Sequence, residues 1–349
     1  MIAHTEATHG TTSAEASPPP PVVLLELMNG YWITQSIAVA AELGIADHLD
    51  AGPRSATDLA TATGADPDSI ARLLRALAMV GVFTEEDGGY GLTPVGAALR
   101  SDVPGSLRAL ARMRGSDWQW RAWSNLVHSV RTGETALDHV YGKPLFEFLA
   151  DHPADGEVFN EAMISHASQM HAAVVGSYDL PEHGTVVDVG CGHGTLIAAI
   201  LRANPTLRAT AFDLPRVLDG ARGWLGQHGL ADRCDFVAGD FFDSVPPGGD
   251  VYALSHVVHD WDDGRALRLL RNCRANMPPH ARLAVCEMVL PEGPEPHFGK
   301  LLDLEMLVNT GGRERTLGEY RRLYEQAGFE LIRVVPTHSP VSVVEGIPV

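Results

Sequence analysis

The second half of the chain alternates between short apolar stretches and amphipathic ones, and this alternation restricts the possible folds more than any other feature. From Thr185 onward, apolar stretches with the length and composition of strands lie at Val186–Val189, Ala209–Asp213, Asp235–Ala238, Val251–His256, Leu283–Val289, Glu330–Val335 and Val341–Glu345. Helices are expected to begin near Thr195, Pro215, Gly264 and Leu317. This alternation predicts an α/β domain with a Rossmann-like, doubly wound and mostly parallel sheet of seven strands. Sheets of this kind bind small molecules at the carboxyl ends of their strands, where the strand order reverses.

The chain before this sheet divides into further segments. Residues 1–21 are rich in Ala, Thr, Ser and Pro, which predicts a disordered tail. Residues 22–112 predict a helical domain, because Asp66 and Pro67 are typical of a helix start, and Val82–Leu92 predicts a β-hairpin. Helices followed by a hairpin resemble a winged helix. Residues 113–180 predict a helical lead-in, which we group with the sheet into one domain over 113–349.

The acidic balance of the chain argues against nucleic acid and anionic membranes as partners. The formal net charge is −18, and such a surface repels phosphate groups. A winged helix that binds DNA also needs basic residues on its DNA-facing helix, and this one offers only Arg72 and Arg75. We therefore favour a packing or dimerisation role for residues 22–112 over DNA binding.

Cysteine usage and hydropathy favour a reduced, cytoplasmic setting. None of Cys191, Cys234, Cys273 and Cys286 forms a C-x-x-C pair or matches a zinc-site spacing. The first Lys or Arg is Arg54, so no charged segment precedes an apolar run, as a secretory signal requires. We also find no uninterrupted apolar run of about 18 residues and therefore expect no membrane span.

A glycine-rich turn follows the first strand of the sheet. Asp188 ends the apolar stretch, and Gly190, Gly192 and Gly194 follow at alternate positions. Glycines let a chain turn sharply and approach a ligand closely, and the helix that starts next points its amide groups at the same place. The spacing differs from the G-x-G-x-x-G of dinucleotide folds. Taken alone, the turn is also compatible with a plain tight turn.

The next two strands also end in side chains suited to a nucleoside. Asp213, followed by Leu214, can accept both hydrogens of a ribose diol, although it could also cap the next helix. Asp240 can bind an adenine amino group, and Phe241 can cover its ring. A Lys/Ser pair for a triphosphate is absent after the glycines. The three strand ends together favour an adenosine ligand with a positive sulfonium, which is S-adenosyl-L-methionine.

The fourth strand runs into a second group of polar residues, Ser255 to Asp263, with His259 just past the strand end. A catalytic role for His259 competes with two alternatives. One is a metal site with His256, which the three-residue spacing and the missing H-E-x-x-H pattern disfavour. The other is a structural histidine. The position at the expected ligand edge keeps the catalytic reading open.

Five motifs in order then give a resemblance to a known family. They are Asp188–Gly194, Asp213, Gly239–Phe242, His259-Asp260-Trp261 and Gly311–Thr316. Over roughly residues 25–349, this pattern resembles the plant-type family of small-molecule O-methyltransferases, which includes many bacterial natural-product enzymes. The last two motifs are more specific than the glycine turn.

The resemblance implies roles for individual residues. The general base of the family falls on His259, and its two flanking acids fall on Glu287 and Glu314. It implies S-adenosyl-L-methionine as the cofactor, no metal, and a homodimer formed through the N-terminal helical domain. Many plant relatives carry Lys where Ser255 stands, so the expected contact of Ser255 with the cofactor is a departure from the pattern.

The substrate side is expected to be apolar. Met163 matches the pocket methionine of the family, and Met306 and Trp261 are further candidates, although helical core is an equally good interpretation. Tyr31 and Trp32 are candidates to reach the pocket of a partner subunit.

The predicted reaction is methylation of a hydroxyl on a small aromatic or quinone-like molecule. A phenol has a pKa of about 10, so a base that takes its proton accelerates the reaction at neutral pH. Carboxylates beside His259 would raise its basicity. Two alternatives remain open: N-methylation, and another reaction (hydroxylation, decarboxylation or cyclisation) with the cofactor bound.

Overall fold

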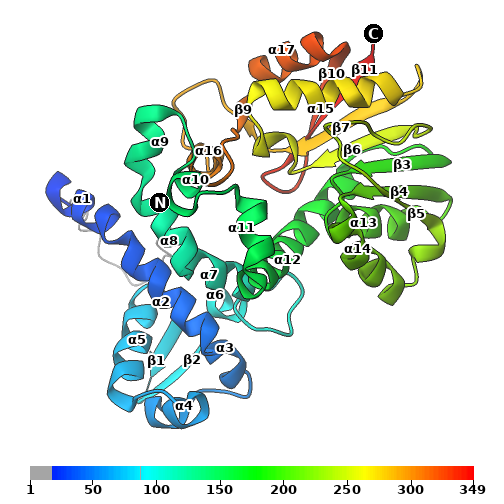
Figure 1. Ribbon diagram of the computed structural model, residues 1–349. Helices are drawn as coiled ribbons and strands as arrows, with labels where there is room; N and C mark the ends of the chain where they lie inside the picture. The colour runs from blue at the N-terminus through cyan, green and yellow to red at the C-terminus, as the bar shows by residue number, and fades with distance from the viewer. Residues whose placement is uncertain (1–17, 87) are drawn as a thin grey trace, which may run out of the picture.

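The computed structural model describes residues 18–86 and 88–349, which form an N-terminal domain, a helical part and a sheet domain (Figure 1). Most of the predicted tail, residues 1–17, lies outside the described residues. The first helix, α1, begins at Pro20, within the range predicted as tail. Proline suits a first helical turn because its missing N–H would have no partner there.

The N-terminal domain packs helices against the predicted hairpin. Its elements are α1 (Pro20–Met28), α2 (Gly30–Glu42), α3 (Ile45–His48), α4 (Ala56–Thr63), α5 (Pro67–Met79), β1 (Phe83–Glu86), β2 (Gly89–Leu92) and α6 (Pro94–Ala97). The Asp66 carboxylate accepts the Ser69 N–H at 2.9 Å and so caps α5, as predicted. Ile70, Leu74 and Leu77 face the core with Phe83 and Tyr90.

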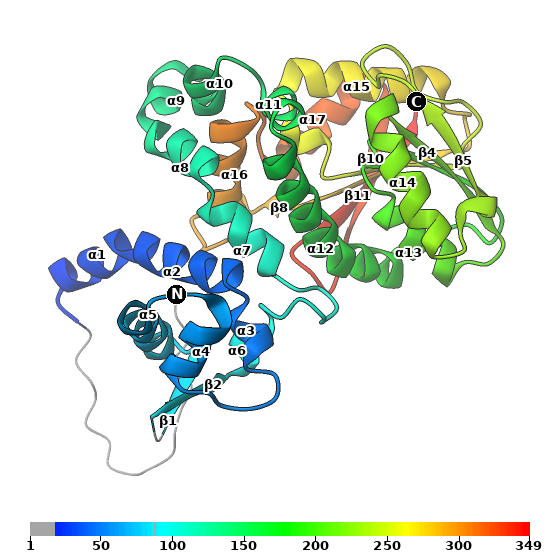
Figure 2. The same ribbon diagram turned by 60° about the horizontal axis from the view of Figure 1, so that its bottom comes forward.

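The helical part has a core of its own, and one of its helices comes from far along the chain. Its helices are α7 (Arg108–Gly115), α8 (Asp117–Ser124), α9 (Leu126–Thr132), α10 (Ala136–Tyr141), α11 (Leu145–Asp151), α12 (Pro153–Ser177) and α16 (Gly299–Asn309). Val308 of α16 belongs to the same buried cluster as Trp118 and Ala162. Figure 2 shows α16 beside α8 and α10. Helix α16 therefore completes the helical part, although it follows most strands of the sheet domain in the sequence.

The sheet domain confirms the predicted fold class. Its strands are β3 (Gly184–Val189), β4 (Leu207–Asp213), β5 (Cys234–Ala238), β6 (Val251–Ser255), β7 (Arg282–Glu287), β10 (Phe329–Pro336) and β11 (Ser342–Pro348). They form a 7-stranded sheet in the order β10-β11-β7-β6-β3-β4-β5. Parallel pairs join β3 to β4 and β6, β4 to β5, and β6 to β7, whereas β11 pairs antiparallel with β7 and β10. The strand order reverses between β3 and β6, so their carboxyl ends flank the expected ligand site.

Helices cover both faces of this sheet. They are α13 (Thr195–Ala203), α14 (Pro215–Gln227), α15 (Asp263–Asn276) and α17 (Leu317–Ala327), which begin at or next to the predicted positions. Figure 1 shows α15 and α17 on one face and α13 and α14 on the other. One buried cluster joins the sheet to α12, α13 and α14, and a second joins it to α15 and α17.

Two predicted strands end earlier than expected. His256 lies outside β6, because its φ of 55° is incompatible with an extended strand. The predicted strand Leu283–Val289 divides at Met288 into β7 and the short β8 (Val289–Leu290). β8 pairs with β9 (Arg315–Thr316), so the chain leaves the main sheet there. Both departures lie at the carboxyl edge of the sheet.

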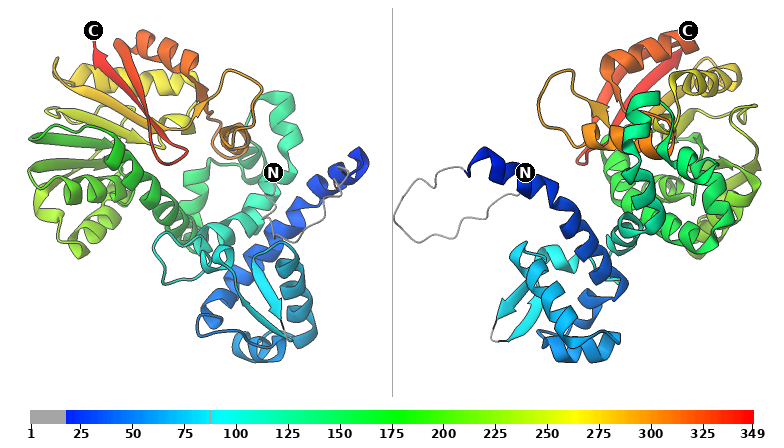
Figure 3. Two further views of the ribbon diagram at one scale, coloured as in Figure 1. Left: turned by 180° about the vertical axis from the view of Figure 1, so that it is seen from behind. Right: turned by 60° about the vertical axis from the view of Figure 1, so that its left-hand side comes forward.

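The expectation of no membrane span stays untested, although one segment is apolar over a length that could cross a membrane. This segment is Pro20–Glu42, 23 residues over α1 and α2. Its few polar residues, such as Glu26 and Gln35, interrupt the apolar run but leave the mean hydropathy high. Helix α1 projects away from the rest of the chain, and its Leu27 side chain is 73% exposed (Figure 3).

Candidate active site

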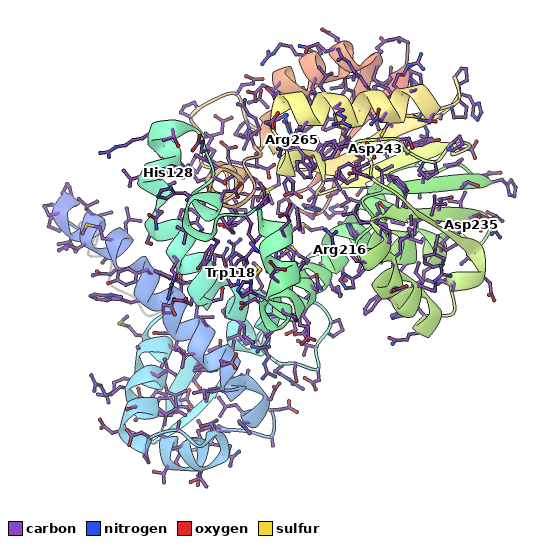
Figure 4. All side chains as sticks on the ribbon, viewed as in Figure 1. Trp118, His128, Arg216, Asp235, Asp243 and Arg265 are labelled. Atoms are coloured by element: carbon purple, nitrogen blue, oxygen red, sulfur yellow. The ribbon has the colours of Figure 1, made fainter. Side chains whose placement is uncertain are left out.

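The predicted site residues meet where the carboxyl ends of the parallel strands face the helical part. Figure 4 shows Asp235, near the start of β5, at the outer rim of the sheet domain. Arg216 and Arg265, which follow the ends of β4 and β6, lie toward the helical part. The edge of the sheet that carries the predicted site therefore faces α11, α12 and α16.

The glycine turn after β3 needs glycine for two physical reasons. Gly190 has a φ of 77°, and a Cβ atom there would lie 2.8 Å from Val257 Cγ2. Val257 lies in the segment that follows β6, so Gly190 lets the two strand ends approach each other. At Gly192, a Cβ would meet nothing within 4 Å, so space remains beside the turn.

One half-buried and one buried carboxylate lie beside this turn. Asp213 accepts the Gly192 N–H through Oδ2 at 2.9 Å and the Leu214 N–H through Oδ1 at 2.7 Å. Burial raises the pKa of Asp213, although these two amides oppose the effect. Asp188 is 1% exposed and its Oδ2 has no hydrogen-bond partner among the described residues. Burial, followed by the charge of Asp213, raises the pKa of Asp188 to about 8.

An aromatic group lies at the end of β5. Asp240 is exposed and accepts the Phe242 N–H through Oδ1 at 2.8 Å. The ring of Phe242 lies 4.8 Å from those of Phe241 and Trp261. Trp261 therefore belongs with the residues expected to cover an adenine ring. The prediction that Trp261 lines the substrate side stays untested, but the neighbouring rings of Phe241 and Phe242 favour a position on the adenine side.

His259 forms a buried ion pair with one of the two predicted acids. It lies in the short helix η2 (Val258–Asp260), and Glu314 Oε1 lies 2.6 Å from its Nδ1. Burial by itself would lower the pKa of His259. The hydrogen bond and the charge of Glu314, together with the charges of Glu287 and Asp260, outweigh burial and raise the pKa to about 10. In the neutral form of the ring, the bond to a carboxylate keeps the proton on Nδ1, which leaves Nε2 as the atom that can accept a proton. The nearest acid to Nε2 is Asp260, with Oδ1 at 3.9 Å.

The second predicted acid, Glu287, holds the backbone and not the imidazole. Its Oε1 accepts the N–H groups of Val257 at 3.2 Å and of His259 at 3.0 Å. Its Oε2 accepts the hydroxyl of Tyr320, a residue that sequence reasoning missed. Glu287 therefore fixes the segment on which His259 lies, and it raises the pKa of the ring through its charge without contacting it. Strand spacing alone gives no sign of this difference from Glu314.

The motif Gly311–Thr316 packs directly on the same segment. A Cβ at Gly312 would lie 1.9 Å from the His259 carbonyl oxygen, so only glycine fits. The buried Arg315 guanidinium donates to the carbonyls of Val258 at 3.1 Å and Trp261 at 2.9 Å. It also pairs with Asp263. Arg315 is a second functional residue that was missed, although the motif containing it was the available signal.

The remaining predicted residues lie on both sides of the site. Met163 of α12 packs against the cluster of the helical part, and Met306 of α16 is buried. The Oγ atom of Ser255 contacts the imidazoles of His171 and His256. Tyr31 and Trp32 are exposed on α2. Within residues 18–86 and 88–349, no three His, Cys, Asp or Glu side chains gather as metal ligands.

Two family models match this chain. A model described as an O-methyltransferase domain matches residues 123–330. A model described as an O-methyltransferase dimerisation domain matches residues 25–102. The two matched regions cover the N-terminal domain and most of the remaining chain.

Similar proteins point the same way. The chain is 49% identical to the phenazine O-methyltransferase PhzM of Lysobacter antibioticus, over 94% of this chain and 96% of the relative. The crystal structure of LaPhzM superposes with a TM-score of 0.90 at 48% identity, covering 95% of this chain and 100% of that one. NcsB1, an O-methyltransferase from neocarzinostatin biosynthesis, was solved with S-adenosylmethionine and 2-hydroxy-5-methyl naphthoic acid. It superposes with a TM-score of 0.78 at 37% identity, covering 91% of this chain and 96% of that one.

Proposed function

The chain belongs to the family of O-methyltransferases with an N-terminal dimerisation domain, and uses S-adenosylmethionine. From this premise we propose that it methylates a hydroxyl of a small aromatic or quinone-like natural product, with His259 as the general base. The observation that carries the proposal is the buried His259–Glu314 pair at the carboxyl edge of the sheet, with Nε2 of His259 left to accept a proton.

The residues at the strand ends fit the cofactor. Asp188 Oδ2 is buried and lacks a partner among the described residues, and the space next to Gly192 is open. Asp213 is held by backbone amides in an orientation that leaves lone pairs on both oxygens for a diol. Asp240 and Phe241 would hold the adenine. When bound, the cofactor supplies a methyl group on a positively charged sulfur.

His259 would take the proton of the substrate hydroxyl on Nε2. With a pKa of about 10, its imidazole matches the pKa of a phenol, so transfer of the proton between them is nearly balanced in free energy. An ordinary imidazole with a pKa of about 6.5 would leave a cost of about 5 kcal/mol for the same transfer. The imidazolium that forms stays paired with Glu314, which stabilises its charge.

The surrounding residues would hold this base in place. Glu287 fixes the backbone of His259 from one side, and Arg315 fixes the carbonyls of the same segment from another. Because an in-line transfer needs the oxygen close to the methyl group, rigid placement of the base and substrate supplies much of the acceleration.

The substrate class and the assembly are also parts of the proposal. One relative reported above is named for a phenazine, and the other was solved with a naphthoic acid, which supports a polycyclic aromatic substrate. The dimerisation model and the exposed apolar side chains of α1 support a homodimer. Four free, buried cysteines fit a reduced cytoplasmic enzyme.

The test compares the parent protein with His259→Gln, using a labelled methyl donor and a panel of phenols. The parent is expected to transfer label to oxygen, and the variant to lose about 10²–10⁴-fold in kcat because the positioned base is gone. Binding of S-adenosylhomocysteine, measured by calorimetry, should stay within threefold of the parent. Full turnover by the variant at neutral pH on an unactivated phenol would contradict the role of His259, and label on nitrogen would contradict O-methylation.

A further inference from the structure

A chain of buried and half-buried polar side chains runs from the glycine turn to the neighbourhood of His259. His171 Nδ1 lies 3.0 Å from Thr195 Oγ1, and His171 Nε2 lies 2.9 Å from Ser255 Oγ. Ser255 Oγ in turn lies 3.1 Å from His256 Nδ1. The chain ends at His256 Nε2, which is buried and has no partner among the described residues. A buried polar atom left without a partner needs a reason.

These hydrogen bonds can run in either direction along the chain, and we adopt the one in which the Thr195 O–H donates to His171 Nδ1. The proton of His171 then lies on Nε2 and is donated to Ser255, whose hydroxyl donates to His256 Nδ1. With this direction, His256 carries its own proton on Nε2. The end of the chain is a free N–H donor.

Both imidazoles stay neutral, as this pattern requires. Burial lowers the pKa of His171 to about 4. Burial, followed by the charge of His259, lowers the pKa of His256 well below its usual value. A neutral imidazole has one N–H, so the position of that proton is fixed by the partner of the other nitrogen.

The backbone turns sharply to place this donor. His256 is the only non-glycine among residues 18–86 and 88–349 with a positive φ, 55°. Side chains in this region are disfavoured, and such positions persist where the surrounding structure imposes them, often at functional sites. The ring centre of His256 lies 5.4 Å from that of His259, so donor and base are neighbours.

We propose that His256 selects substrates that carry a carbonyl or carboxylate oxygen next to the reacting hydroxyl. This inference rests on the proposed function, because His259 must hold the hydroxyl. Two oxygens on adjacent ring positions can then face the two neighbouring imidazoles, one as proton donor to His259 and the other as acceptor from His256 Nε2–H. A phenol without the second oxygen leaves the buried N–H unpaired, which costs about tenfold in affinity or more.

Two substitutions at His256 distinguish the contact made by Nδ1 from the hydrogen bond donated by Nε2. In His256→Asn, the amide nitrogen lies near the position of Nδ1, so the variant can still contact Ser255 and tolerates the positive φ, but it lacks the distal donor. In His256→Gln, the longer side chain puts an N–H near the position of Nε2. The probes are 3-hydroxy-2-naphthoate, with a carboxylate beside the hydroxyl, and 2-naphthol, without it.

Binding is measured by calorimetry on dimeric, full-length protein saturated with S-adenosylhomocysteine. The parent should bind the naphthoate at least about tenfold more tightly than 2-naphthol. His256→Asn should lose that preference and His256→Gln should keep most of it, with 2-naphthol unchanged in both. Equal affinity of the parent for the two probes, no binding of the naphthoate, or equal losses in both variants would overturn the inference. A weakened S-adenosylhomocysteine affinity in His256→Asn would also overturn it, since the donor would then serve the cofactor.

A second measurement needs no substrate. Long-range ¹H–¹⁵N spectra of the ligand-free protein should show the Nε2–H tautomer for His256 and His171 between pH 6 and 8, a range chosen around neutrality. An Nδ1–H tautomer at His256 would overturn the inference. Failure of the proposed function looks different: neither probe accepts a labelled methyl group, while the binding preference and the tautomer persist.

Discussion

At His259, burial and neighbouring charges act on the pKa in opposite directions. Burial disfavours the imidazolium, whereas the carboxylate of Glu314, hydrogen-bonded at 2.6 Å, and the charges of Glu287 and Asp260 favour it. The charges win and raise the pKa to about 10. At neutral pH most of the protein therefore carries the imidazolium, and the form able to accept a proton increases with pH.

The pH profile should report this balance. Because the proposed base is the neutral form of His259, kcat/KM for a phenol should rise about tenfold per pH unit from pH 6 toward 9. In Glu314→Gln, burial is opposed by fewer charges, so the pKa of His259 falls and the rising limb moves to lower pH. The plateau should also fall, because the imidazolium loses its partner. The measurement is kcat/KM against pH for one phenol with both proteins.

A matched control is Glu325→Gln, which removes a carboxylate from an exposed position on α17. Its pH profile should overlay that of the parent. If the rising part of the pH profile stayed in place in Glu314→Gln, or moved to higher pH, it would contradict the assignment of Glu314 as the charge that raises the pKa of His259.

At the scale of elements, the site depends on how closely two loops approach. The segment Val257–Trp261 is held by hydrogen bonds to Glu287 at the end of β7 and to Arg315 in β9. Gly312 allows the loop that carries Arg315 to approach, because its missing Cβ leaves room for the carbonyl of His259. The loop that carries the proposed base is thus positioned by contacts between elements and not by its own hydrogen bonds alone.

Gly312→Ala should separate these two loops. A methyl group 1.9 Å from a carbonyl oxygen forces backbone movement, so the free energy of unfolding should fall by about 1–3 kcal/mol. The displaced His259 should lower kcat at least about tenfold, because catalysis needs precise placement. Denaturant unfolding and steady-state kinetics check the two effects.

Gly223→Ala provides the comparison for this variant. Gly223 lies within α14, and a Cβ there meets nothing within 4 Å. Alanine should stabilise that helix by up to about 1 kcal/mol and leave kcat unchanged. If Gly312→Ala behaved like Gly223→Ala, the close approach would not matter for the site.

At the scale of the whole molecule, α1 exposes large apolar side chains to solvent and buries none of its residues against the rest of the chain. Leu24 and Leu27 are 58% and 73% exposed, and the helix projects from the body in Figures 1 and 3. Exposed apolar patches of this kind mark interfaces. A second copy of the chain is the proposed occupant, in line with the dimerisation model over residues 25–102.

Leu24→Asp combined with Leu27→Asp should therefore weaken the dimer. Two carboxylates buried at an interface cost several kcal/mol, so the variant should elute as a monomer at micromolar concentration in light-scattering chromatography. Met79→Asp is the control, because Met79 is 80% exposed on α5 and lies away from α1 in the chain. A double variant that stayed dimeric with the affinity of the parent would contradict the role of α1.

The sequence by itself determined the sheet, its helices and the order of the motifs. Alternating apolar stretches, the Asp66 cap and the glycine turn are local signals, and they act through backbone preferences that do not need distant partners. For the same reason the strand ends that carry Asp213, Asp240 and His259 could be assigned to one edge of the sheet.

Tertiary structure alone decided how the site works. Glu287 and Glu314 carry the same side chain, yet one binds backbone amides and the other the imidazole. The partners of His171 lie 24 and 84 residues away along the chain. Burial, hydrogen-bond direction and pKa depend on which distant groups surround a side chain, and those neighbours are fixed only when the strands, α12 and α16 have packed together.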